Sequence, residues 1–170
     1  VGDRNKYKNF RSLLKAFFIS KKLSNDFNLV CFGSSPFSND EIDYISDHNF
    51  DFKKIKFFSG DDKDLNYLYM KAELYVCPSM YEGFGLTILE AMNLDCPIIA
   101  SNTSSLKEVG GNTIEYFDPN SINDMSERIE SLVYNNEKKK IMINSYEHHL
   151  DNFSWKKNAL ETQKIYEELS

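Results

Sequence analysis

The chain has 170 residues, a length at which one ordinary domain buries about 70% of its unfolded surface. Its apolar content of 41% and aromatic content of 14% exclude a disordered polar chain. The net charge of −6 argues against a nucleic-acid partner, which needs a basic face, so we expect one folded domain that holds any phosphate at a local site.

The first half of the chain alternates between helical and strand patterns. The opening residues Val1 and Gly2 have the character of a strand end, so we expect them to follow an upstream part of a longer protein. After Lys8, apolar residues recur at spacings of three and four, which predicts a helix to about residue 22. Strands are predicted over 29–32 and 55–58, and helices over 40–48 and through 65–69.

The alternation continues with strands at 74–77, 97–100 and 114–117 and a helix at 86–93. It implies right-handed crossovers and a parallel sheet flanked by helices. Three helices are predicted to follow, over 121–134, 137–150 and 154–169, with N-caps at Ser121 and Ser154. We therefore predict a single Rossmann-like α/β domain whose ligand cleft lies at the carboxyl ends of the strands. The final helix could pack on its own domain or on a separate one.

The three cysteines indicate whether the protein lies in a reducing or an oxidising compartment. Cys31, Cys77 and Cys96 lie in or beside predicted strands and lack metal-ligand spacing, so we interpret them as buried free thiols. Free thiols are typical of a reducing compartment, and we expect a cytoplasmic protein. No stretch approaches the roughly 20 apolar residues that span a bilayer, and no signal-peptide pattern is present.

The run of residues 81–90 is the strongest candidate for a binding site. Its two glycines lie between a predicted strand and a helix, where small residues let the backbone approach a ligand. The amides and the positive dipole end of a helix beginning at Leu86 suit a phosphate. Glu90, one turn into the helix, suits two neighbouring hydroxyls, and Glu82 would face another part of the ligand. Alternatively, Glu82 is an exposed acid of a turn and Glu90 an acid on the helix surface, and neither binds a ligand.

This run resembles the Glu-x7-Glu signature of family-four retaining glycosyltransferases, which have the GT-B fold. The matching residues are Tyr81-Glu82-Gly83-Phe84-Gly85-Leu86-Thr87-Ile88-Leu89-Glu90-Ala91-Met92, followed by Cys96-Pro97-Ile98-Ile99-Ala100 and Phe117-Asp118-Pro119. Val1-Gly2-Asp3-Arg4 and Tyr7-Lys8-Asn9-Phe10 resemble the segment that opens the second domain of these enzymes. The resemblance covers nearly the whole chain, as the C-terminal, donor-binding half of a GT-B enzyme.

The resemblance implies a role for each matching residue. Glu82 would contact the transferred sugar, and Glu90 would hold the ribose hydroxyls. Arg4 and Lys8 would offset the charge of the donor diphosphate. Main-chain groups would face sugar and phosphate, and two residues fall where relatives line the base pocket. The main-chain set is Phe84, Gly85, Leu86 and Thr87, Gly83 belongs to the same donor-binding loop, and the base-pocket pair is Ser59 and Gly60. Thr87 replaces a proline of many relatives, a mild change in a first helical turn.

The resemblance also implies substrates and partners. The donor would be a UDP- or GDP-linked hexose, with no obligatory metal or other cofactor. The acceptor would be a glycan or lipid-linked hydroxyl in bacterial polysaccharide, lipopolysaccharide or glycolipid synthesis. The N-terminal half would bind the acceptor and carry any peripheral attachment to the inner face of the membrane. It would also supply the family's histidine, because His48, His148 and His149 do not match it, so the isolated domain should be inactive.

Other interpretations compete with this one. Asp62-Lys63-Asp64 has the Asp-x-Asp spacing of metal-dependent glycosyltransferases, but we favour helix capping, since Asp61 and Asp62 lie where a helix begins. A dinucleotide-binding dehydrogenase is excluded because neither Gly33-Ser34-Ser35 nor the later glycine run supplies Gly-x-Gly-x-x-Gly. A sugar-nucleotide 2-epimerase of related fold and a non-catalytic domain with the same fold both stay open.

Overall fold

The computed structural model describes residues 1–4 and 6–169. Within these residues it has five strands, β1 (Leu29–Phe32), β2 (Ile55–Phe58), β3 (Tyr75–Cys77), β4 (Ile98–Ser101) and β5 (Glu115–Phe117). All pairings are parallel, which confirms the predicted fold class. The predicted single sheet is divided in two, however. β1 pairs with β2, and β4 lies between β3 and β5, because the facing edges of β1 and β3 are not paired with each other.

The helices lie close to the predicted ranges. They are α1 (Phe10–Ile19), α2 (Lys21–Asp26), α3 (Asn39–Asp47), α4 (Asp62–Lys71), α5 (Leu86–Met92), α6 (Ser104–Gly110), α7 (Ile122–Val133), α8 (Asn136–Asn144), α9 (Tyr146–Leu150) and α10 (Trp155–Glu168). Two 3-10 helices, η1 (Lys6–Lys8) and η2 (Phe52–Lys54), precede α1 and β2. Helix α6 was not predicted as an element.

Serine caps explain where several helices begin. Ser121 and Ser154 cap α7 and α10 as predicted, accepting hydrogen bonds from Asp124 N at 3.2 Å and Lys157 N at 3.0 Å. The helix predicted from Lys8 to residue 22 instead divides at Ser20, whose side chain accepts from Leu23 N at 3.1 Å and starts α2. In the same way, the predicted helix over 137–150 is divided at residue 145 into α8 and α9.

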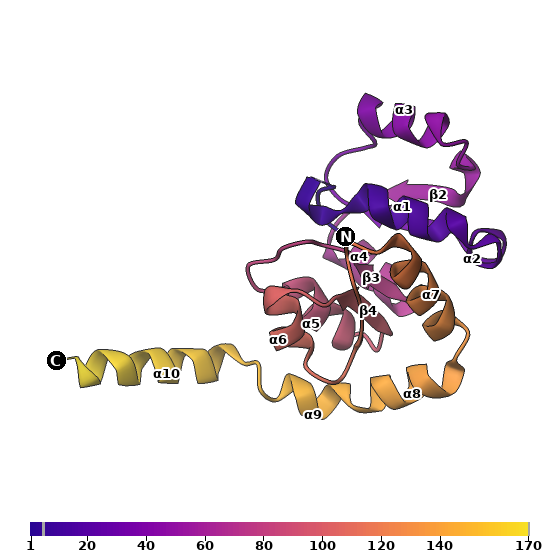
Figure 1. Ribbon diagram of the computed structural model, residues 1–170. Helices are drawn as coiled ribbons and strands as arrows, with labels where there is room; N and C mark the ends of the chain where they lie inside the picture. Colours follow the sequence, from indigo (N-terminus) through magenta and orange to yellow (C-terminus); the bar gives the residue numbers. More distant parts are fainter. Residues whose placement is uncertain (5, 170) are drawn as a thin grey trace.

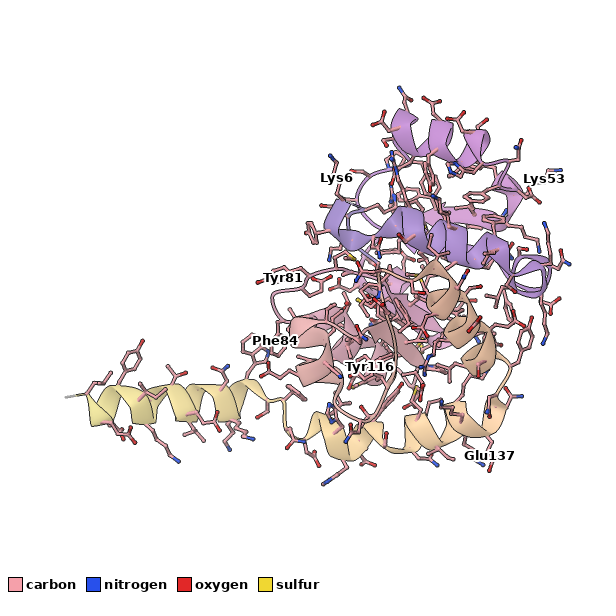
Figure 2. The ribbon with its side chains drawn as sticks, viewed as in Figure 1. Lys6, Lys53, Tyr81, Phe84, Tyr116 and Glu137 are labelled. Atoms are coloured by element: carbon pink, nitrogen blue, oxygen red, sulfur yellow. The ribbon has the colours of Figure 1, made fainter. Side chains whose placement is uncertain are left out.

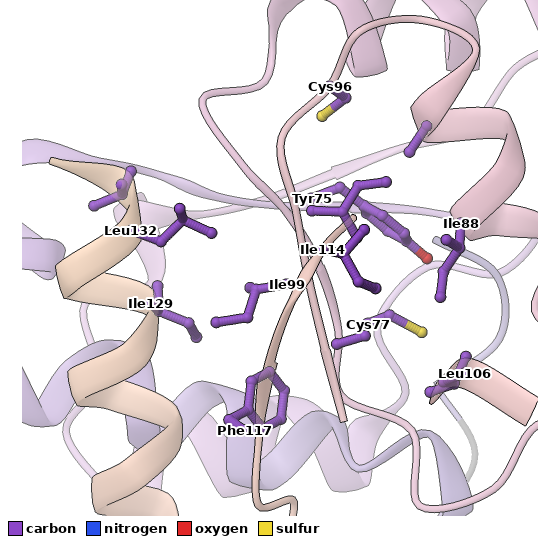
Figure 3. Close-up of a cluster of buried hydrophobic side chains, with 14 of the residues drawn as sticks. Tyr75, Cys77, Ile88, Cys96, Ile99, Leu106, Ile114, Phe117, Ile129 and Leu132 are labelled. Atoms are coloured by element: carbon purple, nitrogen blue, oxygen red, sulfur yellow. The ribbon is translucent and has the colours of Figure 1, made fainter. Parts of the chain in front are cut away.

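The three-stranded sheet forms the centre of the main core. All four residues of β4 are buried, as expected for a middle strand covered on both faces. Figure 3 shows Ile129 and Leu132 of α7 on one side of this sheet and Ile88 and Leu106, from α5 and α6, on the other. The three cysteines are free and buried, which confirms the interpretation of the sequence. A smaller core cluster joins α1 and α3 to the β1–β2 sheet.

Helix α10 stands apart from this body. Figure 1 shows it running away from α9, and it contains no buried residue. The sequence left open whether this helix packs on its own domain or on a separate one. The structure does not show α10 packed on its own domain. Within the described residues, no helix is both long and apolar enough to cross a membrane.

Candidate functional site

The loop between β3 and α5 depends on one glycine. Gly85 is the N-cap of α5 and has φ 102°, a left-handed conformation that side chains disfavour. A Cβ atom built there would also lie 3.0 Å from Leu106 Cδ2, so space and backbone both require glycine. At Gly83, by contrast, a Cβ atom would meet nothing within 4 Å. Protein packing therefore does not require Gly83, the first glycine of the motif.

Lys8, Ser79 and Glu82, here called the Glu82 cluster, meet at the carboxyl end of β3. Lys8 Nζ donates to Glu82 Oε1 at 2.6 Å, and Ser79 Oγ donates to the same oxygen at 2.7 Å. The side chains of Lys8 and Glu82 are 23% and 17% exposed, so both groups are within reach of a ligand but partly shielded from water. The cluster joins two segments 74 residues apart in the sequence.

Main-chain hydrogen bonds hold the segments that carry this cluster. Met80 N donates to Tyr7 O at 2.7 Å, which ties the loop after β3 to η1. Ser105 Oγ, on α6, donates to Glu82 O at 2.7 Å. Lys8 and Glu82 are thus positioned by backbone contacts as well as by their own ion pair.

The charges of the cluster are set by burial and by the ion pair. Burial opposes the charged form of Lys8, but the hydrogen bond and the charge of Glu82 outweigh it and raise the pKa of Lys8. Lys8 therefore stays a cation at neutral pH. The neighbouring Cys77 is different, because burial raises the pKa of its thiol, which disfavours a thiolate nucleophile there.

Arg4 lies in a separate ion pair. Its Nε donates to Glu41 Oε1 at 2.7 Å, and its Nη2 donates to Ser35 O and Pro36 O at 2.9 and 2.8 Å. The guanidinium also lies over the ring of Phe37, 4.7 Å from its centroid. Burial opposes ionisation of Glu41, yet hydrogen bonding by Arg4 lowers the pKa of Glu41 overall. Arg4 thus holds the loop between β1 and α3.

Glu90 and Thr87 lie on the first turns of α5. Glu90 is exposed, and its Oε2 is 3.4 Å from the hydroxyl of Tyr69, which also lies 3.5 Å from Thr87 O. Burial, followed by the charge of Glu90, raises the pKa of Tyr69, so this phenol stays protonated and can only donate to the carboxylate. Tyr69 thus connects α4 with the helix that carries Glu90.

The other predicted site residues lie around this centre. Figure 2 shows Tyr81 and Phe84 on the loop before α5, and the Phe84 ring packs edge-on against Phe153 at 6.2 Å. Ser59 and Gly60 are exposed after β2. A Cβ atom at Gly60 would clash with the side chain of Asp64, so this glycine serves the start of α4.

The start of α4 also explains the Asp-x-Asp pattern. Asp61 accepts from Lys63 N and Asp64 N at 2.8 and 3.2 Å, and Asp64 accepts from Asp61 N at 3.2 Å. These reciprocal bonds form a capping box, so Asp61 and Asp64 are engaged with the backbone. Among the described residues, no group of acidic, histidine or cysteine side chains could hold a metal ion.

A groove of about 420 Å³ runs between β1 and β3, and the Glu82 cluster is part of its lining. Four of the predicted site residues line it, namely Arg4, Lys8, Glu82 and Thr87. The structure therefore places the predicted cations and the loop carboxylate along one groove. The remaining predicted residues, which are Ser59, Gly60, Gly83, Phe84, Gly85, Leu86 and Glu90, do not line it.

A family model described as "Glycosyl transferases group 1" matches residues 1–149. The chain belongs to this family. Among curated relatives, it is 30% identical over 168 residues to "O-antigen chain mannosyltransferase B" of Escherichia coli, covering 98% of this chain and 44% of the relative. The chain thus spans less than half the length of that relative.

Two solved structures show the same fold as this glycosyltransferase chain. The C-terminal domain of a glycosyl transferase group 1 family protein from Francisella tularensis has a TM-score of 0.74 at 22% identity, covering 89% of this chain and 82% of that one. TarM of S. aureus, solved with UDP, has a TM-score of 0.79 at 19% identity, covering 96% of this chain and 34% of that one. These likenesses confirm a GT-B C-terminal domain fold.

The structure adds two residues to the candidate site that sequence reasoning missed. Ser79 orients Glu82, and Tyr69 contacts Glu90. Ser79 is only 2% exposed, and its one usable signal in the sequence is a hydroxyl two residues after a predicted buried strand. Nothing in the sequence paired Tyr69 with Glu90, because the two residues are 21 positions apart on different helices.

Proposed function

We propose that this chain is the donor-binding domain of a retaining glycosyltransferase. It would bind a nucleoside-diphosphate hexose, which the longer protein transfers to a hydroxyl of a glycan or lipid-linked acceptor. The observation that carries the proposal is the Lys8–Glu82 ion pair of 2.6 Å at the carboxyl end of β3, in a chain that belongs to this family. The carboxyl ends of parallel strands are where open α/β folds bind ligands.

The ion pair suggests how the donor is received. Lys8 and Glu82 neutralise each other in their ion pair, so an arriving diphosphate would draw the Lys8 ammonium toward its own oxygens. Glu82 would then keep the hydrogen bond from Ser79 and accept others from sugar hydroxyls. The Lys8 cation would also stabilise the charge that develops on the departing diphosphate. No metal is required for these steps, and we propose none.

Arg4 would supply a second cation only if it leaves Glu41. A Glu41→Gln variant tests this directly, because it weakens the ion pair while keeping the size of the side chain. If Arg4 contacts phosphate, Glu41→Gln will bind UDP or GDP at least as tightly as the unaltered chain, and Arg4→Ala will bind it more weakly. If Arg4→Ala and the unaltered chain bind the nucleotide equally well, Arg4 holds the loop between β1 and α3 and does not contact phosphate.

The comparisons support a hexose donor and a glycan acceptor. The Escherichia coli relative is named a mannosyltransferase of an O-antigen chain, and TarM was solved with UDP. We therefore propose cell-surface polysaccharide synthesis, at a cytoplasmic site, as the setting of the longer protein. A sugar-nucleotide 2-epimerase is the alternative, because it would use a similar donor cleft.

Calorimetry of this chain with UDP, GDP and ADP tests donor binding. At least one nucleotide should bind, and Lys8→Ala should weaken it about tenfold or more, as loss of a charge-assisted contact does. Lys53→Ala is the matched control, because Lys53 is an exposed cation on η2, away from the labelled Tyr81 and Phe84 in Figure 2. Equal affinities of the two variants would contradict the assignment of Lys8.

A second comparison separates the nucleoside from the phosphates. Glu90→Ala should weaken binding of the nucleoside diphosphate but not of inorganic pyrophosphate, because the carboxylate accepts hydrogen bonds from the ribose hydroxyls, which pyrophosphate lacks. An equal loss for both ligands would contradict the ribose role. Asp62→Ala, which removes an exposed acid of α4, serves as the control.

A further inference from the structure

Helix α6 holds the loop between β3 and α5 at two points. Ser105 Oγ donates to Glu82 O at 2.7 Å, which fixes the loop at Glu82. The buried side chain of Leu106 lies against Gly85, where a Cβ atom would be only 3.0 Å from Leu106 Cδ2. Both contacts come from α6, so the position of this loop depends on the position of that helix.

Phe84, between these two points, is held from another part of the chain. Its side chain is 46% exposed, and its ring packs edge-on against the ring of Phe153, with centroids 6.2 Å apart. Figure 2 shows Phe84 beside the segment that joins α9 to α10. An aromatic pair of this geometry is favourable beyond the area that it buries. Phe153 therefore restrains the part of the loop that α6 does not hold.

Phe153 is itself fixed by the end of α9. Its N–H donates to Leu150 O at 2.9 Å, and its side chain is partly buried against the main core. The ring of His149 lies 5.3 Å from the ring of Phe153, from centroid to centroid. Phe153 thus belongs to the packed domain, although α10 begins two residues later and has no buried residue.

His149 connects the same segment to the end of α6. Its Nε2 is 2.7 Å from Val109 O, and because a carbonyl oxygen only accepts, Nε2 carries the hydrogen. A Cβ atom at Gly111, the C-cap of α6, would lie 3.0 Å from His149 Cε1, so the imidazole packs closely against this helix end. Residues 149–153 therefore contact both α6 and the loop that α6 supports.

We infer that Phe153 is a positioning residue for the donor and acts through Phe84. The inference rests on the proposed function, in which this loop receives the donor. Phe153 and the two contacts from α6 hold the loop before a donor arrives, so that Glu82 and the first amides of α5 keep their places. Without the Phe153 ring the loop has more conformations, and binding of the donor must then restrict them at a cost in affinity.

A double-mutant cycle tests this inference by calorimetry with UDP or GDP. Phe153→Ala should weaken binding about fivefold, and Phe153→Leu, which keeps an apolar contact but no ring, about twofold. In a chain that already carries Phe84→Ala, adding Phe153→Ala should change the affinity by less than about twofold, because the partner ring is gone. Phe50→Ala is the matched control. It removes a partly buried ring that stacks on Phe18 in the smaller core cluster, and it should not change the affinity.

Hydrogen exchange without nucleotide separates this inference from the proposed function. Ile88 N donates to Gly85 O at 2.9 Å, so its exchange reports opening of the first turn of α5, directly after Phe84. Exchange at Ile88 should be about fivefold faster in Phe153→Ala. Ile42 N, which donates to Ser38 O at 2.9 Å in the first turn of α3, should not change and is the internal reference.

Faster exchange at Ile88, with a loss of affinity that disappears in the Phe84→Ala background, would support the inference. Unchanged exchange at Ile88, normal affinity of Phe153→Ala, or equal losses in both backgrounds would overturn it. If the unaltered chain binds none of the nucleotides, the proposed function fails, and exchange at Ile88 alone then decides whether Phe153 anchors the loop.

Discussion

At the scale of single residues, the Arg4–Glu41 pair makes stability depend on pH. The pKa of Glu41 lies below its ordinary value of 4.5 in the folded chain, so its contribution is present above that pH and is lost as pH falls through the lowered pKa. The urea midpoint of the unaltered chain should therefore fall more steeply below pH 4.5 than that of Glu41→Gln. We expect the pair to contribute about 0.5–1 kcal/mol to the free energy of unfolding, because solvent screens a partly exposed ion pair.

The control for this pH profile is Glu127→Gln, which alters an exposed acid of α7. It should follow the profile of the unaltered chain. Parallel profiles for Glu41→Gln and the unaltered chain between pH 3 and 7 would show that the ion pair does not stabilise the fold.

The two glycines of the site loop should respond differently to alanine. Gly85→Ala should lower the free energy of unfolding by about 1–3 kcal/mol, because φ is 102° there and Leu106 is in the way. Gly83→Ala should change it by less than about 0.5 kcal/mol, because its Cβ meets open space. If the donor approaches the backbone of Gly83, nucleotide binding will nevertheless weaken in Gly83→Ala.

Thermal unfolding and calorimetry of the two variants separate these effects. Normal nucleotide affinity in Gly83→Ala would mean that the ligand does not approach this residue. Normal stability of Gly85→Ala would mean that the left-handed turn before α5 relaxes at little cost.

At the scale of elements, the cap of α4 accounts for an acidic pattern that resembles a metal site. Asp61→Ala removes the acceptor for Lys63 N and Asp64 N and should cost about 1 kcal/mol of stability. Asp62→Ala removes a charge from the same turn but no cap, so it should cost less than about 0.5 kcal/mol. Urea unfolding measures both losses of stability. Equal losses in the two variants would mean that the negative charge of the first turn, and not the cap, stabilises α4.

Most elements could be predicted from the sequence because their signals are local. The strand that Gly33 follows and the caps at Ser121 and Ser154 are each predicted from a few neighbouring residues. The division of the sheet could not be predicted, since it depends on which edges find partners in space. The same reason hid the Arg4–Glu41 pair, whose members are 37 residues apart.

At the scale of the whole molecule, α10 contributes little to this domain. It has no buried residue, and its Trp155 is 85% exposed. A chain ending at residue 154 should therefore have the same thermal midpoint as the full chain, within about 2 °C, because little apolar surface is lost from contact. Scanning calorimetry of the two chains measures this, and a drop of more than about 5 °C would show that α10 packs on the domain in solution.

Transfer of labelled sugar by the longer protein tests the donor-binding function most directly. With radiolabelled UDP- or GDP-hexose and a glycan acceptor, the label should move to the acceptor with retained anomeric configuration. Glu82→Gln should lower kcat/KM about a hundredfold or more, while Glu127→Gln should not change it. Label that stays in a nucleotide sugar epimerised at C2, or transfer by Glu82→Gln at the unaltered rate, would contradict it.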